Sequence, residues 1–146
     1  MRQDTVPKPE GCTLQNDRGT SSPRGRSRVY EGLDRVARTG IFALQQCEEC
    51  EKVQYPPREI CWNCLSDRLA FKKQTDEATL LAKTRIWRPY EPRFENRVPV
   101  AVGLVQLDAG PVALAMLDDD PAPLERLRLS LEFDADGHAV IRARKD

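Results

Sequence analysis

The chain has a single histidine, His138, and lacks any run of about 18 apolar residues, the length that a membrane-spanning helix needs. Histidine is the side chain most often used for general acid–base catalysis. Lys and Arg number 23 together, as do Asp and Glu, so no excess of positive charge is available to hold nucleic acid phosphates. These absences argue against a free-standing catalyst, a membrane protein and a nucleic-acid binder. They favour a protein that binds or assembles something.

The five cysteines stand in a chain whose first eight residues are polar and carry no apolar core of a signal peptide. We therefore expect a cytoplasmic location, where thiols stay reduced. In that setting the cysteines indicate metal binding or redox chemistry rather than disulfides. Cys12 lies far from the other four along the chain, and we interpret it as an incidental thiol.

Residues 1–28 are rich in Pro, Gly, Ser, Arg and Asp and contain few apolar side chains. Such a segment buries too little surface to offset its ordering entropy, so we expect it to be disordered when free. It is either a solvated tail or an arm that orders against a partner.

A short helix is expected after this tail. Apolar residues between 29 and 39 recur at helical spacing and share one face: Val29, Leu33, Val36 and Ala37. Gly40 then gives a helix stop signal. The β-propensity of residues 41–44 predicts a short strand that leads into the cysteines.

The C-terminal half shows the two-residue period of strands. Five segments are predicted as strands: residues 80–88, 98–107, 112–117, 126–133 and 139–143, of which 98–107 is apolar on both faces. In the first segment we expect one face to hold Leu80, Ala82, Thr84 and Ile86, and the other to hold Leu81, Lys83, Arg85 and Trp87. Residues 89–97 are expected to form a loop, and Gly103 fits a bend or bulge. Five short strands would leave open edges in a flat sheet, and closing into an OB-type barrel removes them.

Two Cys-x2-Cys pairs, Cys47/Cys50 and Cys61/Cys64, are separated by ten residues. Each pair can form a tight knuckle, and two facing knuckles supply four thiolates in the closed tetrahedral geometry of structural zinc. The alternative is two reduced redox pairs. Iron could occupy the same four-sulfur cage, but nothing else in the sequence suggests electron transfer. Such an ion would have no open coordination position, so its role would be to fold a segment with almost no core of its own.

The helix, the paired knuckles with Tyr55-Pro56-Pro57-Arg58 between them, and the barrel resemble the rubredoxin-like zinc-ribbon/OB-fold proteins associated with thiolases and other acyl-CoA enzymes. The resemblance runs from about Val29 to the C-terminus. The family often has Gly directly after the second Cys of each pair, where this chain has Glu51 and Leu65. The implied fold is mostly β, with a short N-terminal helix, a rubredoxin-like zinc ribbon and a C-terminal five-stranded OB-fold barrel. The expected divisions are 1–28 (tail), 29–46 (helix and lead-in strand), 47–74 (ribbon) and 75–146 (barrel).

The resemblance implies a non-catalytic subunit that binds a thiolase, a hydratase or a ketosteroid-type aldolase and helps to hold a CoA thioester. A surface that contacts CoA combines Arg or Lys with an aromatic face. Four neighbouring residues could form one: Lys83, Arg85, Trp87 and Arg88. The alternative for them is a solvated strand face. Trp62, inside a knuckle, either packs on the ribbon or contacts the partner.

Zinc ribbons and OB-folds also bind single-stranded nucleic acid, which is the alternative function for this chain. The balanced charge disfavours it, because a groove that follows the phosphate backbone needs excess Lys and Arg. His138, in a predicted turn, and the consecutive Asp118, Asp119 and Asp120 are interpreted as surface residues rather than as catalytic or metal sites.

Overall fold

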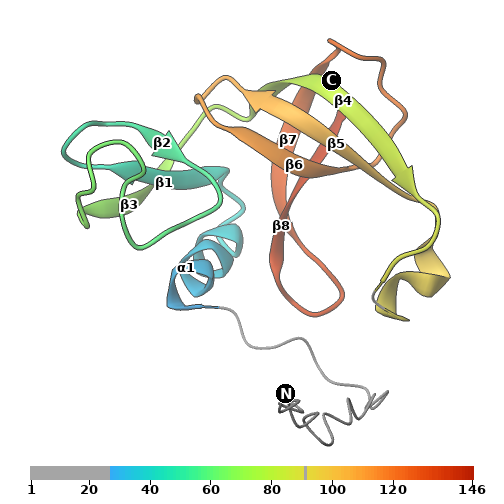
Figure 1. The fold of residues 1–146 in the computed structure, drawn as a ribbon, viewed down its shortest axis with the longest axis horizontal. Helices are drawn as coiled ribbons and strands as arrows, with labels where there is room; N and C mark the ends of the chain where they lie inside the picture. The colour runs from blue at the N-terminus through green and yellow to red at the C-terminus, as the bar shows by residue number, and fades with distance from the viewer. Residues whose placement is uncertain (1–26, 91) are drawn as a thin grey trace, which may run out of the picture.

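The computed structural model describes residues 27–90 and 92–146, ordered as one helix, a three-stranded sheet and a β-barrel (Figure 1). The predicted tail, apart from its last two residues, lies outside the described residues, as does Cys12. Helix α1 spans Arg28–Ala37, and Gly40 follows it with a positive φ of 71°, as the stop signal predicts. Within the described residues, no helix has the length and apolar character to cross a membrane.

The first sheet carries the cysteines. It consists of β1 (Ala43–Cys47), β2 (Val53–Gln54) and β3 (Leu69–Lys73) in the antiparallel order β2-β1-β3. Strand β1 begins two residues later than the sequence predicted. Strand β3 was not predicted at all: its residues are half-buried or exposed, so no clean alternation marks it, and pairing with β1 creates it.

The second sheet closes into a barrel. Its strands are β4 (Glu77–Ile86), β5 (Val100–Leu107), β6 (Val112–Leu117), β7 (Arg126–Phe133) and β8 (Ala139–Lys145), in the order β4-β5-β6-β8-β7. The one parallel pair joins β6 to β8. This is the five-stranded OB-type barrel expected from the sequence, and closure gives every strand two neighbours. A short 3-10 helix, η1 (Pro92–Arg97), lies in the segment predicted as a loop.

A bulge in β4 overturns the predicted faces of its second half. The register with β5 shifts between Leu80 and Ala82, so that Leu80 pairs with Val105 but Ala82 pairs with Leu104. The extra residue, Leu81, reverses which side chains face inward. Ala82, Thr84 and Ile86 therefore do not continue the face of the buried Leu80, and all three are exposed.

Gly103 was expected to mark a bend or bulge, but the bulge lies on the neighbouring strand. A Cβ at Gly103 would lie 2.7 Å from a methyl of Leu80 and 3.0 Å from one of Leu117, so glycine is needed to let these two side chains fill the barrel. The position is one of close approach, not of unusual backbone conformation.

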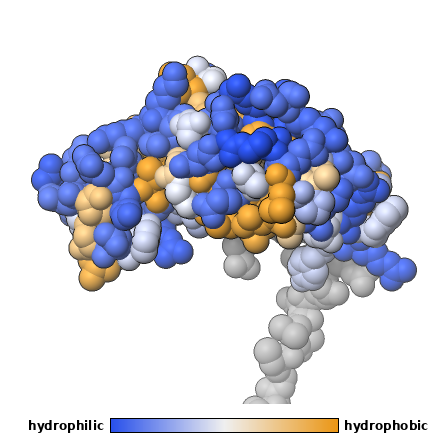
Figure 2. Space-filling model, turned by 90° about the horizontal axis from the view of Figure 1, so that it is seen from above, coloured by the Kyte–Doolittle hydropathy of each residue, from blue (hydrophilic) through white to orange (hydrophobic). Residues whose placement is uncertain are grey.

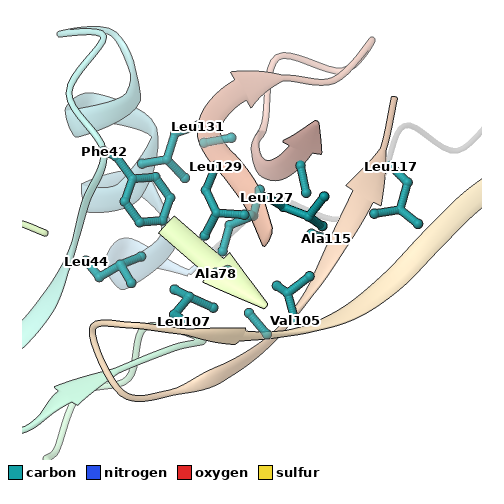
Figure 3. Packing of buried hydrophobic residues seen from close by; sticks show 14 of the residues in the cluster. Phe42, Leu44, Ala78, Val105, Leu107, Ala115, Leu117, Leu127, Leu129 and Leu131 are labelled. Carbon is teal, nitrogen blue, oxygen red and sulfur yellow. The ribbon is translucent and has the colours of Figure 1, made fainter. Parts of the chain in front are cut away.

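One apolar core runs through both sheets and the helix. Two residues of α1, Leu33 and Ala37, belong to the same buried cluster as the barrel leucines, together with Phe42 just before β1 and Leu44 within it. Figure 3 shows Phe42 and Leu44 facing the barrel strands. The helix approaches the ribbon so closely that a Cβ at Gly32 would lie 2.6 Å from the ring of Phe71. The ribbon and the barrel therefore support each other through shared side chains.

Candidate metal centre

The two knuckles repeat one hydrogen-bond pattern. In the first, the N–H of Glu51 donates to the carbonyl of Cys47 at 3.1 Å, and the N–H of Glu49 donates to Cys47 Sγ at 3.4 Å. In the second, Leu65 donates to the carbonyl of Cys61 at 3.1 Å, and Asn63 donates to Cys61 Sγ at 3.4 Å. Each turn therefore directs its two sulfurs to the same side, as the Cys-x2-Cys spacing predicts.

The four sulfurs converge on one point. Their Sγ atoms all lie within 4.8 Å of one another, and the pairs Cys47–Cys64 and Cys50–Cys61 are each 3.5 Å apart. Tetrahedral zinc with a Zn–S bond of about 2.3 Å requires S–S separations of about 3.8 Å. The set fits one such ion with small adjustments, and four protein ligands would leave no open position for substrate. The arrangement therefore fits a structural metal.

The surroundings of two of these thiols shift their pKa values in opposite directions. The backbone N–H of Lys52, helped by Asn63 and the sulfurs of Cys61 and Cys64, lowers the pKa of Cys50 to about 6. At Cys64 the backbone N–H of Ser66 acts to lower the pKa, but desolvation and the other three sulfurs outweigh it and raise the pKa to about 12. Four thiolates this close repel one another, and a divalent cation is the partner that allows all four to ionise together.

Both knuckles end in a residue with left-handed backbone: Glu51 has a φ of 59° and Leu65 a φ of 63°. These are the two positions at which the resembling family often has glycine. Glycine adopts this conformation without the clash that a Cβ makes, a clash that costs about 1–2 kcal/mol. The departure from the family pattern changes the cost of each turn but not its shape.

Replacing Leu65 by glycine should raise the free energy of unfolding by about 1 kcal/mol at a fixed, saturating zinc concentration. The side chain is 73% exposed, so little packing is lost. Ile60 is 51% exposed in the same ribbon and has no positive φ, so Ile60→Gly is the matched control and should destabilise. Urea unfolding of the two variants measures the difference. If Leu65→Gly destabilises as much as the control, this account of the knuckle is wrong.

A buried glutamine pair, which the sequence analysis missed, orients the second knuckle. Gln45 and Gln54 face each other across β1 and β2 at 5% and 3% exposure, and Gln54 Nε2 donates to Gln45 Oε1 at 2.7 Å. Gln45 also exchanges two hydrogen bonds of 2.8 Å with the backbone of Arg58. Gln54 Oε1 accepts from the N–H of Trp62 at 3.1 Å. Two Gln residues at matching strand positions were the only sequence signal.

The residues predicted to contact CoA or a partner lie at one end of the barrel but do not form a single cluster. Lys83 and Arg85 both reach Asp120, with N–O distances of 2.6 Å and 3.3 Å, and line a cavity of about 320 Å³. These pairs also lower the pKa of Asp120, with Lys83 the main cause. Trp87 and Arg88 follow the end of β4 and are exposed, Trp87 at 65%.

A larger groove of about 690 Å³ lies between the ribbon and the turn that joins β5 to β6. Trp62 lines it and is 57% exposed, and so do Tyr55 and Arg58 of the Tyr-Pro-Pro-Arg stretch and the nearby Lys52. Trp62 is therefore not covered by the ribbon on which it stands. Cationic and aromatic side chains lie together in this groove. The sequence analysis did not predict that these ribbon residues lie next to the barrel.

The remaining candidates are held by structural contacts. His138 Nδ1 lies 3.8 Å from Asp34 Oδ2, an interaction that ties α1 to the turn before β8. The three consecutive aspartates point to different partners: Asp118 to Arg142, Asp119 to the N–H of Lys145, and Asp120 to Lys83. They do not converge on a common point, and the described residues contain no metal-type cluster besides the four cysteines.

Comparison with known proteins agrees with this architecture. The chain matches two protein-family descriptions in sequence order, "ChsH2, rubredoxin-like zinc ribbon domain" over residues 35–70 and "ChsH2, C-terminal OB-fold domain" over residues 72–133. Among solved structures it is similar to a chain of "Ltp2-ChsH2(DUF35) aldolase". The identity is 21%, the match covers 84% of this chain and 98% of that chain, and the TM-score is 0.67. At that identity the likeness shows a shared fold.

A second solved structure is a DUF35-family protein of unknown function from Sulfolobus solfataricus. It is 17% identical, with 81% of this chain and 82% of that chain covered and a TM-score of 0.49. The two family descriptions together span more than half of the chain and follow each other as the ribbon and the barrel do. This protein therefore belongs to the ChsH2 family of zinc-ribbon and OB-fold proteins.

Proposed function

We propose that this chain is a non-catalytic accessory subunit of an acyl-CoA-processing enzyme, which stabilises the catalytic subunit and helps to hold the CoA thioester. The observation that carries the proposal is the matched ribbon and barrel pair, which in the similar solved structure belongs to an assembly titled an aldolase. The chain's own groups support it: the cysteines form a closed set, and the single histidine is tied to Asp34.

Cys47, Cys50, Cys61 and Cys64 would hold one structural zinc ion. The sulfur separations favour a tetrahedral cage, and a cage of four thiolates would also accept iron. Bound there, the ion supplies charge neutralisation and a cross-link between the two knuckles. It takes no part in the chemistry of the acyl group.

The finer assignment is to a thiolase. By sequence, the chain is similar to the small subunit of the benzoylsuccinyl-CoA thiolase of anaerobic toluene degradation. The similar solved structure is named for an aldolase, so the two reaction types need to be distinguished. Thiolysis consumes free CoA and forms a second thioester, whereas retro-aldol cleavage releases a carbonyl compound and leaves the number of thioesters unchanged.

Contact with CoA is proposed at the barrel end that carries Lys83, Arg85, Trp87 and Arg88. The Lys83–Arg85–Asp120 cluster has a net charge of +1, and Arg88 makes no ion pair with any described residue. The anionic phosphates of CoA would be attracted to this positive charge, and the exposed Trp87 ring offers a face for the adenine. The nucleic-acid alternative has less support, because the arginines on β7 and β8 are paired with carboxylates.

Affinity purification of the tagged full-length chain from its native host tests this function. We expect a thiolase-type subunit of roughly 40 kDa, the size of one to two large domains, identified by mass spectrometry. The complex should cleave benzoylsuccinyl-CoA only when free CoA is supplied. Failure to cleave it, together with CoA-independent cleavage of a β-hydroxyacyl-CoA that releases a carbonyl compound, would reassign the partner to the aldolases. An unaccompanied monomer, or thioester turnover by the chain alone, would refute the accessory role.

A further inference from the structure

One wall of the barrel is apolar on its outer surface. Across β4, β5 and β6, the outward-facing residues align in rows such as Ala82–Leu104–Leu114 and Thr84–Val102–Met116. We name this wall the apolar face; its outward positions are Ala82, Thr84, Ile86, Val100, Val102, Leu104, Gln106, Val112, Leu114 and Met116. None of them carries a charge. Leu114 is 61% exposed and Leu104 and Val112 are each 42% exposed, whereas Val102 between Thr84 and Met116 is buried at 9%.

On the opposite wall of the same barrel, the outward-facing side chains are mostly charged. Outward positions on β7 and β8 hold Arg126, Arg128, Glu132, Arg142 and Arg144, and each is in an ion pair. The contrast lies within one sheet, so it does not reflect a general shortage of charge in the chain. Contiguous exposed apolar surface of this kind marks an interaction site. Figure 2 shows hydrophobic side chains gathered in patches between polar regions.

The fold limits how a partner can bind there. The barrel is closed, but β4 pairs with β7 only over residues 77–79, so beyond Leu80 it has β5 as its one strand partner. On the wall itself, the groups available to a partner are the outward side chains of β4, β5 and β6. In an OB barrel the second and third strands, here β5 and β6, form the face that usually receives ligand. Nucleic acid on that face requires aromatic and cationic side chains, whereas this face presents leucine, valine and methionine. Its composition suits a protein surface.

Charge at the rim indicates the partner's chemistry. Where β4 ends and β5 begins, the exposed charges among the side chains that the structure describes are Arg88, Arg97 and Glu95, a net positive set with no ion pair to another described residue. At the other borders of the face, charged side chains form ion pairs within the chain, such as Arg126–Asp108 and Arg142–Asp118. A complementary surface is therefore apolar with carboxylates along one side. The apolar face of a second copy of this chain has no acidic residue among its outward positions, so a second copy does not supply these carboxylates.

We propose that the apolar face is the surface on which the larger catalytic subunit docks, through an apolar patch bordered by carboxylates at the Arg88–Arg97 end. This inference rests on the proposed function and specifies which part of the chain performs it. Docking here would cover the exposed leucines and would set the partner beside Lys83 and Arg85, at the barrel end proposed to meet CoA.

The test uses Leu114→Glu and Leu104→Glu in the full-length chain, titrated against the catalytic subunit purified from the native complex. A carboxylate placed in an apolar interface loses its hydration without gaining a partner, so each variant should raise the Kd about tenfold or more. Both side chains are exposed, so the variants should keep the wild-type melting temperature. Leu114→Glu, at the more exposed position, decides alone if the other fails to fold.

Leu65→Glu is the matched control, because Leu65 is 73% exposed on the ribbon, away from the barrel wall. It should bind like the wild type. Loss of binding by Leu65→Glu alone, or unchanged binding by Leu114→Glu, would overturn the inference while leaving the proposed function intact. Sedimentation of the wild type as a dimer that Leu114→Glu dissociates would assign the face to a second copy instead. A wild type that captures no such subunit refutes the proposed function itself.

Discussion

Replacing Cys61 by serine should remove the metal from the chain and unfold the zinc ribbon, the largest effect expected of any single substitution. Cys61 is 1% exposed, and its Sγ lies 3.5 Å from that of Cys50. A structural zinc ion contributes an apparent binding free energy of about 10–16 kcal/mol in small zinc-binding peptides, and most of it is lost when one of four ligands is lost. The ribbon strands β1, β2 and β3 are too short to replace it with packing of their own.

The damage should extend beyond the ribbon. Phe42 and Leu44 belong to the same core as the barrel leucines, so unfolding the ribbon uncovers one side of the barrel. We expect metal content per chain, measured by mass spectrometry, to fall from one equivalent to near zero. Amide exchange should rise in β1 and β3 first and then in β7. Cys12→Ser removes a thiol from the sequence without touching the four-sulfur set and should keep its metal. A Cys61→Ser chain that retains a full equivalent would refute the ligand assignment.

Replacing Gln54 by leucine should lower the free energy of unfolding by about 2–4 kcal/mol, the second largest effect we expect. Leucine matches the volume of glutamine, so the loss comes from hydrogen bonds and not from a cavity. The N–H of Trp62 would lose its acceptor and the carbonyl of Ile60 its donor. Oε1 of Gln45 would keep only the bond from the N–H of Arg58. A buried polar group left without a partner costs about 1–3 kcal/mol. The second knuckle would also lose the contact that orients it, so zinc affinity should fall as well.

Gln74→Leu is the matched control, because Gln74 makes one exposed hydrogen bond of 3.3 Å, to the carbonyl of Lys72. It should change stability by less than about 0.5 kcal/mol. Guanidinium unfolding at fixed zinc, and zinc competition with a chromophoric chelator, measure the two effects separately. Equal stability of Gln54→Leu and Gln74→Leu would show that the glutamine pair does not support the knuckle.

Local patterns in the sequence were sufficient to predict the convergence of the four sulfurs and most strands. A Cys-x2-Cys pair is a self-contained turn, so the convergence of its two sulfurs is decided by four residues and their own hydrogen bonds. The β6 segment, residues 112–117, was predicted with its observed bounds because a Gly-Pro turn at residues 108–111 precedes this apolar run and an Asp- and Pro-rich break at residues 118–123 follows it. The barrel followed from the count of such strands, since open edges are costly for any sheet.

Other features depend on contacts between distant segments. Strand β3 exists because β1 offers it a partner, and its own residues carry no clear period. The bulge at Leu81 arises where β4 pairs with β5. This one extra residue reverses which side chains of the second half of β4 face inward. The rows of the apolar face became visible only when this register placed Ala82, Leu104 and Leu114 side by side.

The amino-acid sequence by itself determined the four-sulfur set, the mostly β character and the division into ribbon and barrel, because short-range geometry and side-chain period encode all three. The tertiary structure alone decided that ribbon, helix and barrel share one core, that a glutamine pair orients the second knuckle, and that one barrel wall is apolar while the other is charged. These properties arise from register and packing between residues far apart in the chain, and no local pattern records which distant partner a side chain will meet.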